Sequence, residues 1–271
     1  MTTGTVGTTI ADRHHLRRAV RSELAKLSPR SPALSVAVPL AVLIPLSVNA
    51  AIAAAAAQNR IDGSGGMDTN NSAYWILVFS TFILMAGAAF SMGAEFGNGT
   101  VDTVFAASAR RWTLPVAKAI VFGAVAAVAG ALATLIVVGG LPVVFPEIWG
   151  RVDLFSATGV ALWCGVAYYM VLATLLGIGS AVFLPRAGLV MMGVLLWKFG
   201  VETAVTFVPG DAGMLLQRLS PFRNAELGVG QMSTIDSLFG GRIGSLAFFT
   251  VLCVAVFAAA VARLSRMDVM R

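Results

Sequence analysis

Apolar residues gather into six long runs along the 271-residue chain, separated by short polar stretches. Each run holds about 20 or more residues, the length that an α-helix needs to cross a hydrocarbon core of about 30 Å. Helix is expected because an open strand in lipid leaves its backbone amides unpaired. The pattern predicts an all-α, polytopic membrane protein with six transmembrane helices at residues 33–57, 73–94, 119–141, 157–184, 187–208 and 243–262.

The composition agrees with a single transmembrane domain over residues 1–271. Hydrophobic residues make up 58% of the chain and charged residues 12%, about half of the roughly 25% charged residues of soluble domains. The mean hydropathy is +0.84. These values exclude a water-soluble globular protein, and with it a folded basic surface for nucleic acid.

The charges between the runs predict the orientation in the membrane. One set of polar stretches comprises residues 1–32, 95–118, 185–186 and 263–271. The other set comprises residues 58–72, 142–156 and 209–242. The first set carries 13 Lys or Arg and 5 acidic residues, whereas the second carries 5 and 7. Because basic residues are retained on the cytoplasmic side, we expect both termini in the cytoplasm of a bacterium, with the protein in its inner membrane.

The first run has a competing interpretation as a cleaved signal peptide, because residues 50–57 are rich in alanine and offer cleavage sites. Its 25 apolar residues far exceed the 7 to 15 typical of a signal peptide. A retained first span is therefore favoured.

Residues 14–27 predict an amphipathic helix before the first span. Its apolar face is expected to contain Leu16, Val20, Leu24 and Leu27, with arginines and a lysine on the other faces. Such a helix would lie along the inner membrane surface with its basic face toward anionic headgroups. The alternative is an ordinary solvated, charged helix.

Residues 95–118 predict a short helix between the second and third spans. Gly97 and Gly99 favour the end of one helix, and Thr100 is a suitable N-cap for the next. The new helix would run over residues 101–107 and display apolar side chains on the cytoplasmic side. Either a partner protein or the inner lipid surface would cover them.

The longest outer stretch, residues 209–242, alternates polar and apolar residues and contains a proline and several glycines. It either dips back into the membrane as one or two short helices or forms a surface loop.

The order of these features resembles the permease subunits of type-2 ATP-binding-cassette exporters. The motifs concerned are Gly93-x-Glu95-x-x-x-Gly99-Thr100, Arg110-Arg111, Lys118, the Ser-Glu-Leu-Ala-Lys-Leu of residues 22–27, residues 197–202 and Arg266-Met267-Asp268-Val269. The resemblance covers most of the chain and depends on the order of loose motifs over six spans.

The resemblance implies a six-helix half-transporter that forms a homodimer and binds two separate ATPase subunits. The short helix would be a coupling helix that docks into the ATPase, the N-terminal helix an elbow helix, and residues 209–242 a re-entrant pair. The implied ATPase-coupling residues are Glu95, Gly99, Thr100, Val101, Asp102, Val104 and Phe105.

The sequence offers little material for chemistry of its own. It lacks the G-x-x-x-x-G-K-[ST] loop that cradles nucleotide phosphates, so ATP and Mg²⁺ are expected on the partner ATPase and no cofactor on this chain. Two adjacent histidines near the N-terminus provide no catalytic triad and no metal site. We therefore expect no enzymatic activity from this chain alone.

Lys198 and Glu202 are charged residues deep within the fifth run. Each costs about 2.5–3.5 kcal/mol at a helix centre, and their i,i+4 spacing favours a pair that offsets this cost. Such a pair would be a polar element of the translocation path or dimer interface, or merely a self-neutralised structural pair.

The leading prediction is therefore a membrane-embedded exporter subunit in contact with the lipid bilayer. An ATP-independent secondary transporter or channel is the main alternative, for which more ionisable residues in the spans or an inverted repeat would be expected. A membrane-embedded enzyme or assembly factor is a third possibility and lacks the clustered catalytic residues it would need.

Overall fold

All six predicted runs form long helices in the computed structural model. The structure describes residues 4–63, 65–100 and 110–266, with side chains from His14 onward, and these residues contain no strand. Six helical segments are long and apolar enough to span a membrane: Ala33–Ala57, Thr69–Gly97, Thr113–Val144, Ala157–Phe183, Ala187–Phe207 and Arg242–Arg266. The prediction of six spans is confirmed at this level, and the helices extend a few residues beyond several of the predicted bounds.

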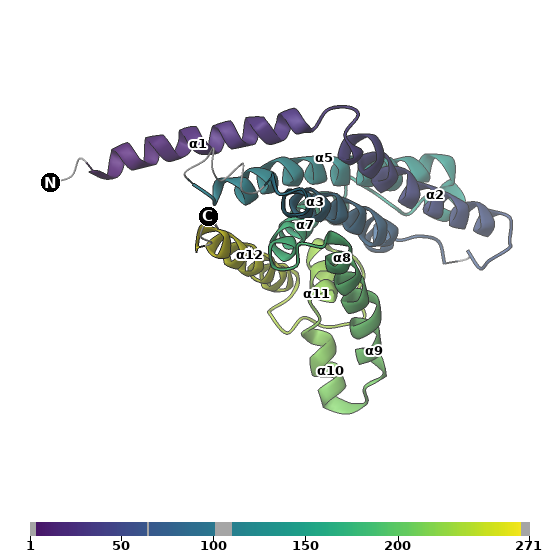
Figure 1. Ribbon diagram of the computed structural model, residues 1–271. Helices are drawn as coiled ribbons and strands as arrows, with labels where there is room; N and C mark the ends of the chain where they lie inside the picture. The colour runs from purple at the N-terminus through teal and green to yellow at the C-terminus, as the bar shows by residue number, and fades with distance from the viewer. Residues whose placement is uncertain (1–3, 64, 101–109, 267–271) are drawn as a thin grey trace.

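The helical elements follow one another with short connections (Figure 1). The chain begins with α1 (Gly4–Lys26), η1 (Ala33–Ala37), α2 (Val38–Ala57), η2 (Thr69–Asn71), η3 (Ile76–Ser80) and α3 (Thr81–Gly97). It continues with α5 (Thr113–Val144), α6 (Pro146–Trp149), α7 (Ala157–Phe183), α8 (Ala187–Leu195), η4 (Leu196–Val201), α9 (Glu202–Ala204) and η5 (Val205–Phe207). The last elements are α10 (Gly210–Arg218), α11 (Pro221–Val229) and α12 (Arg242–Arg266). Of these, η1, η3 and η4 are π-helical.

Helix α7 lies at the centre and packs against α3, α5 and α12. Glycines permit two of these contacts: a Cβ at Gly177 would lie 2.9 Å from the backbone oxygen of Met85 in α3, and one at Gly179 would lie 3.1 Å from Cα of Phe257 in α12. Small residues let membrane helices approach this closely.

A proline in α2 receives compensation from a neighbouring helix. Pro45 lacks the N–H that would bond to the carbonyl of Ala41 one turn earlier. The hydroxyl of Ser80, in η3, donates a hydrogen bond to that carbonyl. In an apolar environment this contact removes the cost of an unpaired backbone oxygen and fixes α2 against the second span.

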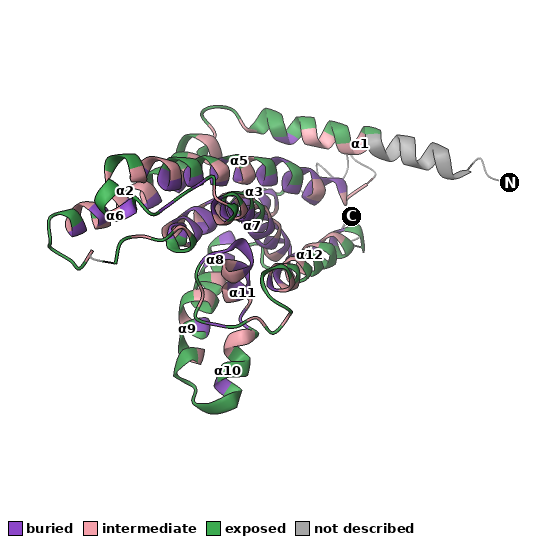
Figure 2. Ribbon diagram, turned by 180° about the vertical axis from the view of Figure 1, so that it is seen from behind, coloured by how far each residue is buried: buried purple, intermediate pink, exposed green. Residues whose placement is uncertain are grey.

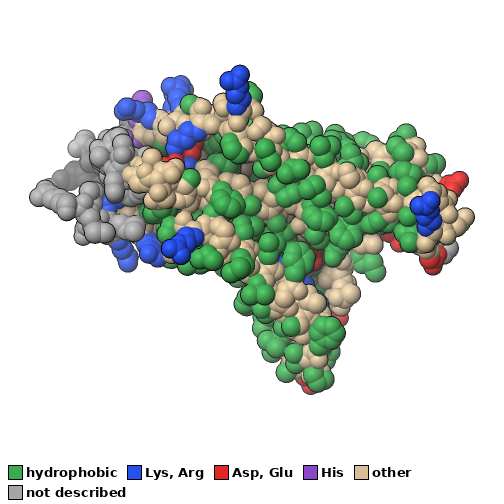
Figure 3. All heavy atoms as spheres, turned by 45° about the vertical axis from the view of Figure 1, so that its right-hand side comes forward, with side chains coloured by type: hydrophobic (Ala, Val, Ile, Leu, Met, Phe, Trp, Pro, Cys, Tyr) green, Lys and Arg blue, Asp and Glu red, His purple; other side chains and the backbone are tan. Residues whose placement is uncertain are grey.

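The exposed surface of the bundle is mainly apolar between two charged ends. The outward faces of α2, α12 and the α8 to α10 segment are largely exposed, while α3 and α7 are mostly buried (Figure 2). The start of α1 and the end of α12 lie at one end of the bundle (Figure 1), and Lys and Arg side chains gather there (Figure 3). Such a surface suits a bilayer around the middle of the molecule.

The predicted outer segment contains two short helices, α10 and α11. Helix α11 packs against α7 and α12, and its Phe222, Ala225 and Val229 are buried. Helix α10, in contrast, exposes Met214 and Leu215. The segment is therefore two short helices, of which one belongs to the core of the bundle.

Candidate functional site

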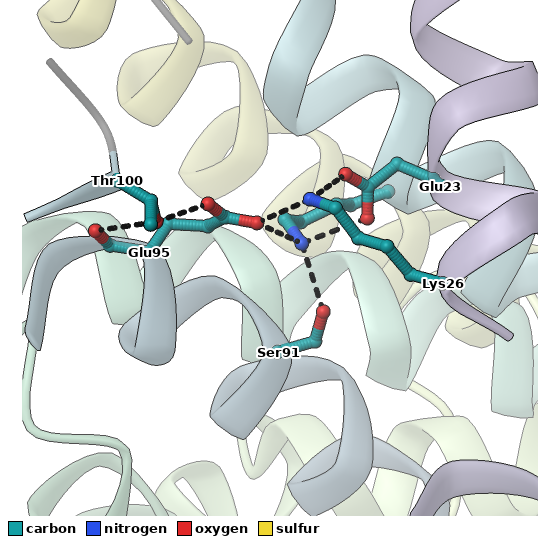
Figure 4. A network of polar contacts seen from close by, with 6 residues as sticks. Glu23, Lys26, Ser91, Glu95 and Thr100 are labelled. Carbon is teal, nitrogen blue, oxygen red and sulfur yellow. Dashed lines mark hydrogen bonds and ion pairs between the residues drawn. The ribbon is translucent and has the colours of Figure 1, made fainter. Parts of the chain in front are cut away.

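Four charged residues form a closed network where α1 and α3 end and α5 begins (Figure 4). Glu23 accepts from Lys26 at 2.6 Å and from Lys118 at 2.8 Å. Glu95 Oε1 lies 2.7 Å from Lys26 Nζ and 3.0 Å from Lys118 Nζ. Each carboxylate therefore contacts both ammonium groups, and we call these four residues the charge ring.

Three helices supply the charge ring. Glu23 and Lys26 come from the last turns of α1, Glu95 from the last turn of α3, and Lys118 from the second turn of α5. Helix α1 packs along α5, which brings the charges together across 95 residues of sequence. The ring thus joins the N-terminal helix to both sides of the connection between α3 and α5.

Lys118 is the most buried member, with 1% of its side chain exposed. Its ammonium nitrogen lies within 3.0 Å of three acceptors: Glu23, Glu95 and the hydroxyl of Ser91, the last at 2.9 Å. An unpaired charge in this setting is costly, and removing one partner of a buried pair typically costs about 3–5 kcal/mol. The ring places two positive and two negative charges together, which compensates their burial.

Lys26 is the half-exposed member of the ring. Burial lowers the pKa of Lys26, but the hydrogen bonds and charges of Glu23 and Glu95 outweigh burial and raise it above the ordinary value of 10.5. A pKa raised on folding means that the contribution to stability is fully present below pH 10.5 and disappears as the pH rises through the folded value. Lys26 is therefore protonated throughout the physiological range.

The connection that leaves α3 is attached to the charge ring. Helix α3 ends at Gly97, and Gly99 adopts a left-handed conformation with φ of 67°, which agrees with the predicted helix end. Thr100 Oγ1 then donates to Glu95 Oε2 at 2.6 Å. The hydroxyl of Thr100 therefore bonds back to the preceding helix.

The predicted coupling residues divide into two groups. Glu95, Gly99 and Thr100 lie together at the end of α3, and Glu95 is 7% exposed, so it serves the ring and presents no free carboxylate to a partner. The other four, Val101, Asp102, Val104 and Phe105, lie outside the described residues.

Residues 14–26 of the predicted amphipathic segment are helical as part of α1, but the buried positions differ from the prediction. Leu16, Val20 and Leu27 are half-buried, whereas Leu24 is 54% exposed and faces away from the bundle. Glu23 occupies the buried stripe instead. Glu23 is therefore buried where the pattern predicted Leu24, because its carboxylate pairs with Lys118 of α5.

Sequence reasoning missed the ring, although one signal was present. Position 23 continues the spacing of residues 16, 20 and 27, so a carboxylate falls on the apolar stripe of the N-terminal helix. Lys118 is likewise a lone charge at the start of an apolar run. Two opposite charges on two apolar faces indicate a pair, but only the fold shows that they meet.

The predicted pairing of Lys198 with Glu202 is corrected by the structure. Lys198 forms its ion pair with Glu226 of α11. Glu202 instead accepts the backbone N–H groups of Phe222 at 2.9 Å and Arg223 at 3.2 Å, at the start of α11. Residues 196–201 are π-helical, which changes the angular offset that an α-helical i,i+4 pair needs.

These contacts give Lys198 and Glu202 a clear structural role. The Glu202 carboxylate accepts from the unpaired amides at the N-terminus of α11, where the helix dipole also favours negative charge. The guanidinium of Arg223 donates to the backbone oxygen of Glu202 at 3.1 Å. Together with the Lys198–Glu226 pair, they fix the fifth span to α11.

No group of His, Cys, Asp or Glu able to hold a metal ion occurs among the described residues. Comparison of the chain with protein-family models, with curated proteins and with solved structures finds no match.

Proposed function

We propose that this chain is the membrane-spanning subunit of an ATP-binding-cassette exporter and that it forms the translocation pathway as a homodimer with two ATPase subunits. The observation that supports it most is the charge ring, which links the end of α3, before the α3–α5 connection, to the second turn of α5, after it. The resemblance in sequence order assigns the coupling helix to this connection.

A connection that receives a push from an ATPase has to be attached firmly to the spans that move. Thr100 and Glu95 hold its start, and Lys118 lies a few residues after its end. Because Glu23 and Lys26 bind the same charges, α1 would move with α3 and α5 as one unit. Rocking of such rigid groups between inward- and outward-facing states is an established form of alternating access.

The energy source in this proposal is external. The chain has no phosphate-binding loop, so ATP and Mg²⁺ would bind to the ATPase subunits. The termini and the α3–α5 connection would face the cytoplasm of a bacterial cell, in agreement with the excess of Lys and Arg on those stretches. Helix α1 would act as the elbow helix, and α10 and α11 as the re-entrant pair.

Homodimer formation would cover part of the apolar surface that a single chain leaves open. Large side chains of the fifth span and α10 are exposed, including Leu196, Trp197, Phe207 and Leu216. Lipid covers apolar surface equally well, so the choice between lipid and a second copy has to be measured.

The experiment is co-purification with an ATP-binding-cassette ATPase subunit from the same organism, beginning with any encoded beside this chain. We expect Phe105→Asp to abolish co-purification while membrane insertion persists. Phe155→Asp, at an 86% exposed position between α6 and α7, is the matched control and should retain the ATPase.

Undiminished co-purification of the Phe105→Asp variant would show that the docking residues are wrongly assigned. Transport by the reconstituted chain without any ATPase would overturn the proposal and favour a secondary transporter or channel.

A further inference from the structure

The two halves of the fifth span differ in how they are held. The span is 17% buried over its most apolar window, the lowest value of the six. Its inner half, α8, packs against α3 and α7 and buries Ala187, Val190 and Met191. In its outer half, residues 196–207, Glu202 is the only buried residue. The core of the bundle therefore holds the inner half of the span, whereas α9 and α10 project away from it (Figure 1).

The two halves meet at η4, which is π-helical. A π-helix uses i→i+5 hydrogen bonds in place of i→i+4, is rare, and is a known site of kinks in helices. Beyond η4 the backbone becomes α-helical at Glu202 and 3₁₀-helical at Val205. Residues 196–207 thus pass through three hydrogen-bond registers. A change of register at η4 would tilt the residues that follow while α8 keeps its place.

Polar contacts hold the outer half against α11. The Glu202 carboxylate binds the N-terminal amides of α11, and Lys198 pairs with Glu226. Phe199 adds a ring contact with Phe82 of α3, with the centroids 5.6 Å apart. Helix α11 itself is anchored in the bundle, because it packs against α7 and α12. The outer half is therefore held to a fixed helix by a few directed contacts, which can break without leaving a cavity in the core.

We propose that residues 196–207 swing about η4 and that Glu202, on the N-terminus of α11, is the latch that holds them closed. The movement itself requires only membrane insertion. Its role rests on the proposed exporter function, in which the swing would open the outer end of the translocation pathway. Hinge movements of this kind depend on a few residues that change their backbone conformation.

The test measures the distance between the outer half and the end of α11 by pulsed electron paramagnetic resonance. Spin labels are attached after Phe207→Cys and Met232→Cys, at positions 81% and 66% exposed, in a chain whose Cys164 and Cys253 are replaced by Ala. The chain is reconstituted in nanodiscs without an ATPase and diluted with unlabelled copies, so that only distances within one chain are measured. We expect one main distance. Glu202→Ala should raise the population at longer distances at least tenfold, as expected for the loss of hydrogen bonds to a charged group.

Thr203→Ala is the matched control, because Thr203 is adjacent to Glu202 and exposed. It should leave the distance distribution unchanged. A second measurement needs no latch variant and serves if Glu202→Ala fails to fold. In hydrogen exchange of the unaltered chain, the amides of residues 196–203 should exchange at least tenfold faster than those of residues 161–168, which lie equally far from the outer end of the fourth span.

Three results would overturn the proposal. The first is a folded Glu202→Ala variant with an unchanged distance distribution. The second is an equal shift in Thr203→Ala. The third is equal hydrogen exchange in the two segments. Because these measurements use no ATPase, a wrong exporter assignment would leave the results expected for the latch unchanged.

Discussion

Lys118 is the residue on which the charge ring depends most, because it is buried and contacts both carboxylates. Lys118→Met keeps the length of the side chain but leaves Glu23 and Glu95 with Lys26 alone. We expect a loss of about 3–5 kcal/mol in unfolding free energy, the usual cost of an uncompensated buried charge. Denaturant unfolding of the purified protein in detergent would measure it.

Two further variants test whether the loss of stability in Lys118→Met comes from the charge ring or from the removal of any cation. Arg151→Met breaks an ion pair between Arg151 and Asp68, and the side chains of both residues are more than 60% exposed. The substitution should lower the free energy of unfolding by less than about 1 kcal/mol. Combining Lys118→Met with Glu23→Gln restores neutrality and should recover part of the loss. A double variant whose cost equals the sum of the single costs would contradict a coupled ring.

The pair Lys198 and Glu226 makes a second prediction at this scale. Exchanging the two, as Lys198→Glu with Glu226→Lys, should retain the folded protein, whereas each single change places like charges together. Exchanging Lys198 with Glu202 should fail, because the new carboxylate at position 198 would face Glu226. Yield of monodisperse protein after purification distinguishes the two exchanges. Equal yields from both would contradict the pairing with Glu226.

The ion-pair partners of the charged residues could not be predicted from the sequence, and the reason is physical. Hydropathy shows that a charge at position 118 or 202 lies at or within a membrane span, but pairing depends on which helices are neighbours. Glu23 and Lys118 are 95 positions apart and meet only because α1 packs along α5. Local spacing therefore identified costly residues and, for Lys198, assigned the wrong partner.

At the scale of helices, the sequence predicted the number and approximate bounds of the long helices, because each one is apolar along its own length. The predicted first span, 33–57, has the bounds that the structure gives. Hydropathy could not predict that the second helical segment starts at Thr69, because residues 69–71 are polar and form a 3₁₀ turn before the span. The two helices of residues 209–242 were predicted only as one of two alternatives.

Gly177 supports a prediction on how the helices α3 and α7 pack. Gly177→Ala places a Cβ 2.7 Å from Cγ and 2.9 Å from the backbone oxygen of Met85, so one helix has to move. We expect a loss of about 1–3 kcal/mol in unfolding free energy, typical of overpacking. Gly193→Ala in α8 has open space and should stabilise the helix by up to about 1 kcal/mol. Equal effects of the two substitutions would contradict the close α3–α7 contact.

Over the whole molecule, the charged residues between the apolar runs gather toward the two ends of an apolar bundle (Figure 3). The stretches that include α1 and the α3–α5 connection carry a net charge of +8, and those at the other end carry −2. A basic end is retained in the cytoplasm during insertion. The same basic end holds the charge ring, so the orientation decides which compartment the ring faces.

This orientation predicts which engineered cysteines a membrane-impermeant maleimide reaches in intact spheroplasts. In a Cys164→Ala background, with Cys253 buried, we expect Gly65→Cys to be labelled at once and Ser28→Cys only after permeabilisation. Position 65 has open space and position 28 is exposed, so access alone does not distinguish them. The reverse labelling pattern would place the charge ring outside the cell and exclude docking of a cytoplasmic ATPase. A mature chain that lacks residue 28 would instead show that the first span is a cleaved signal peptide.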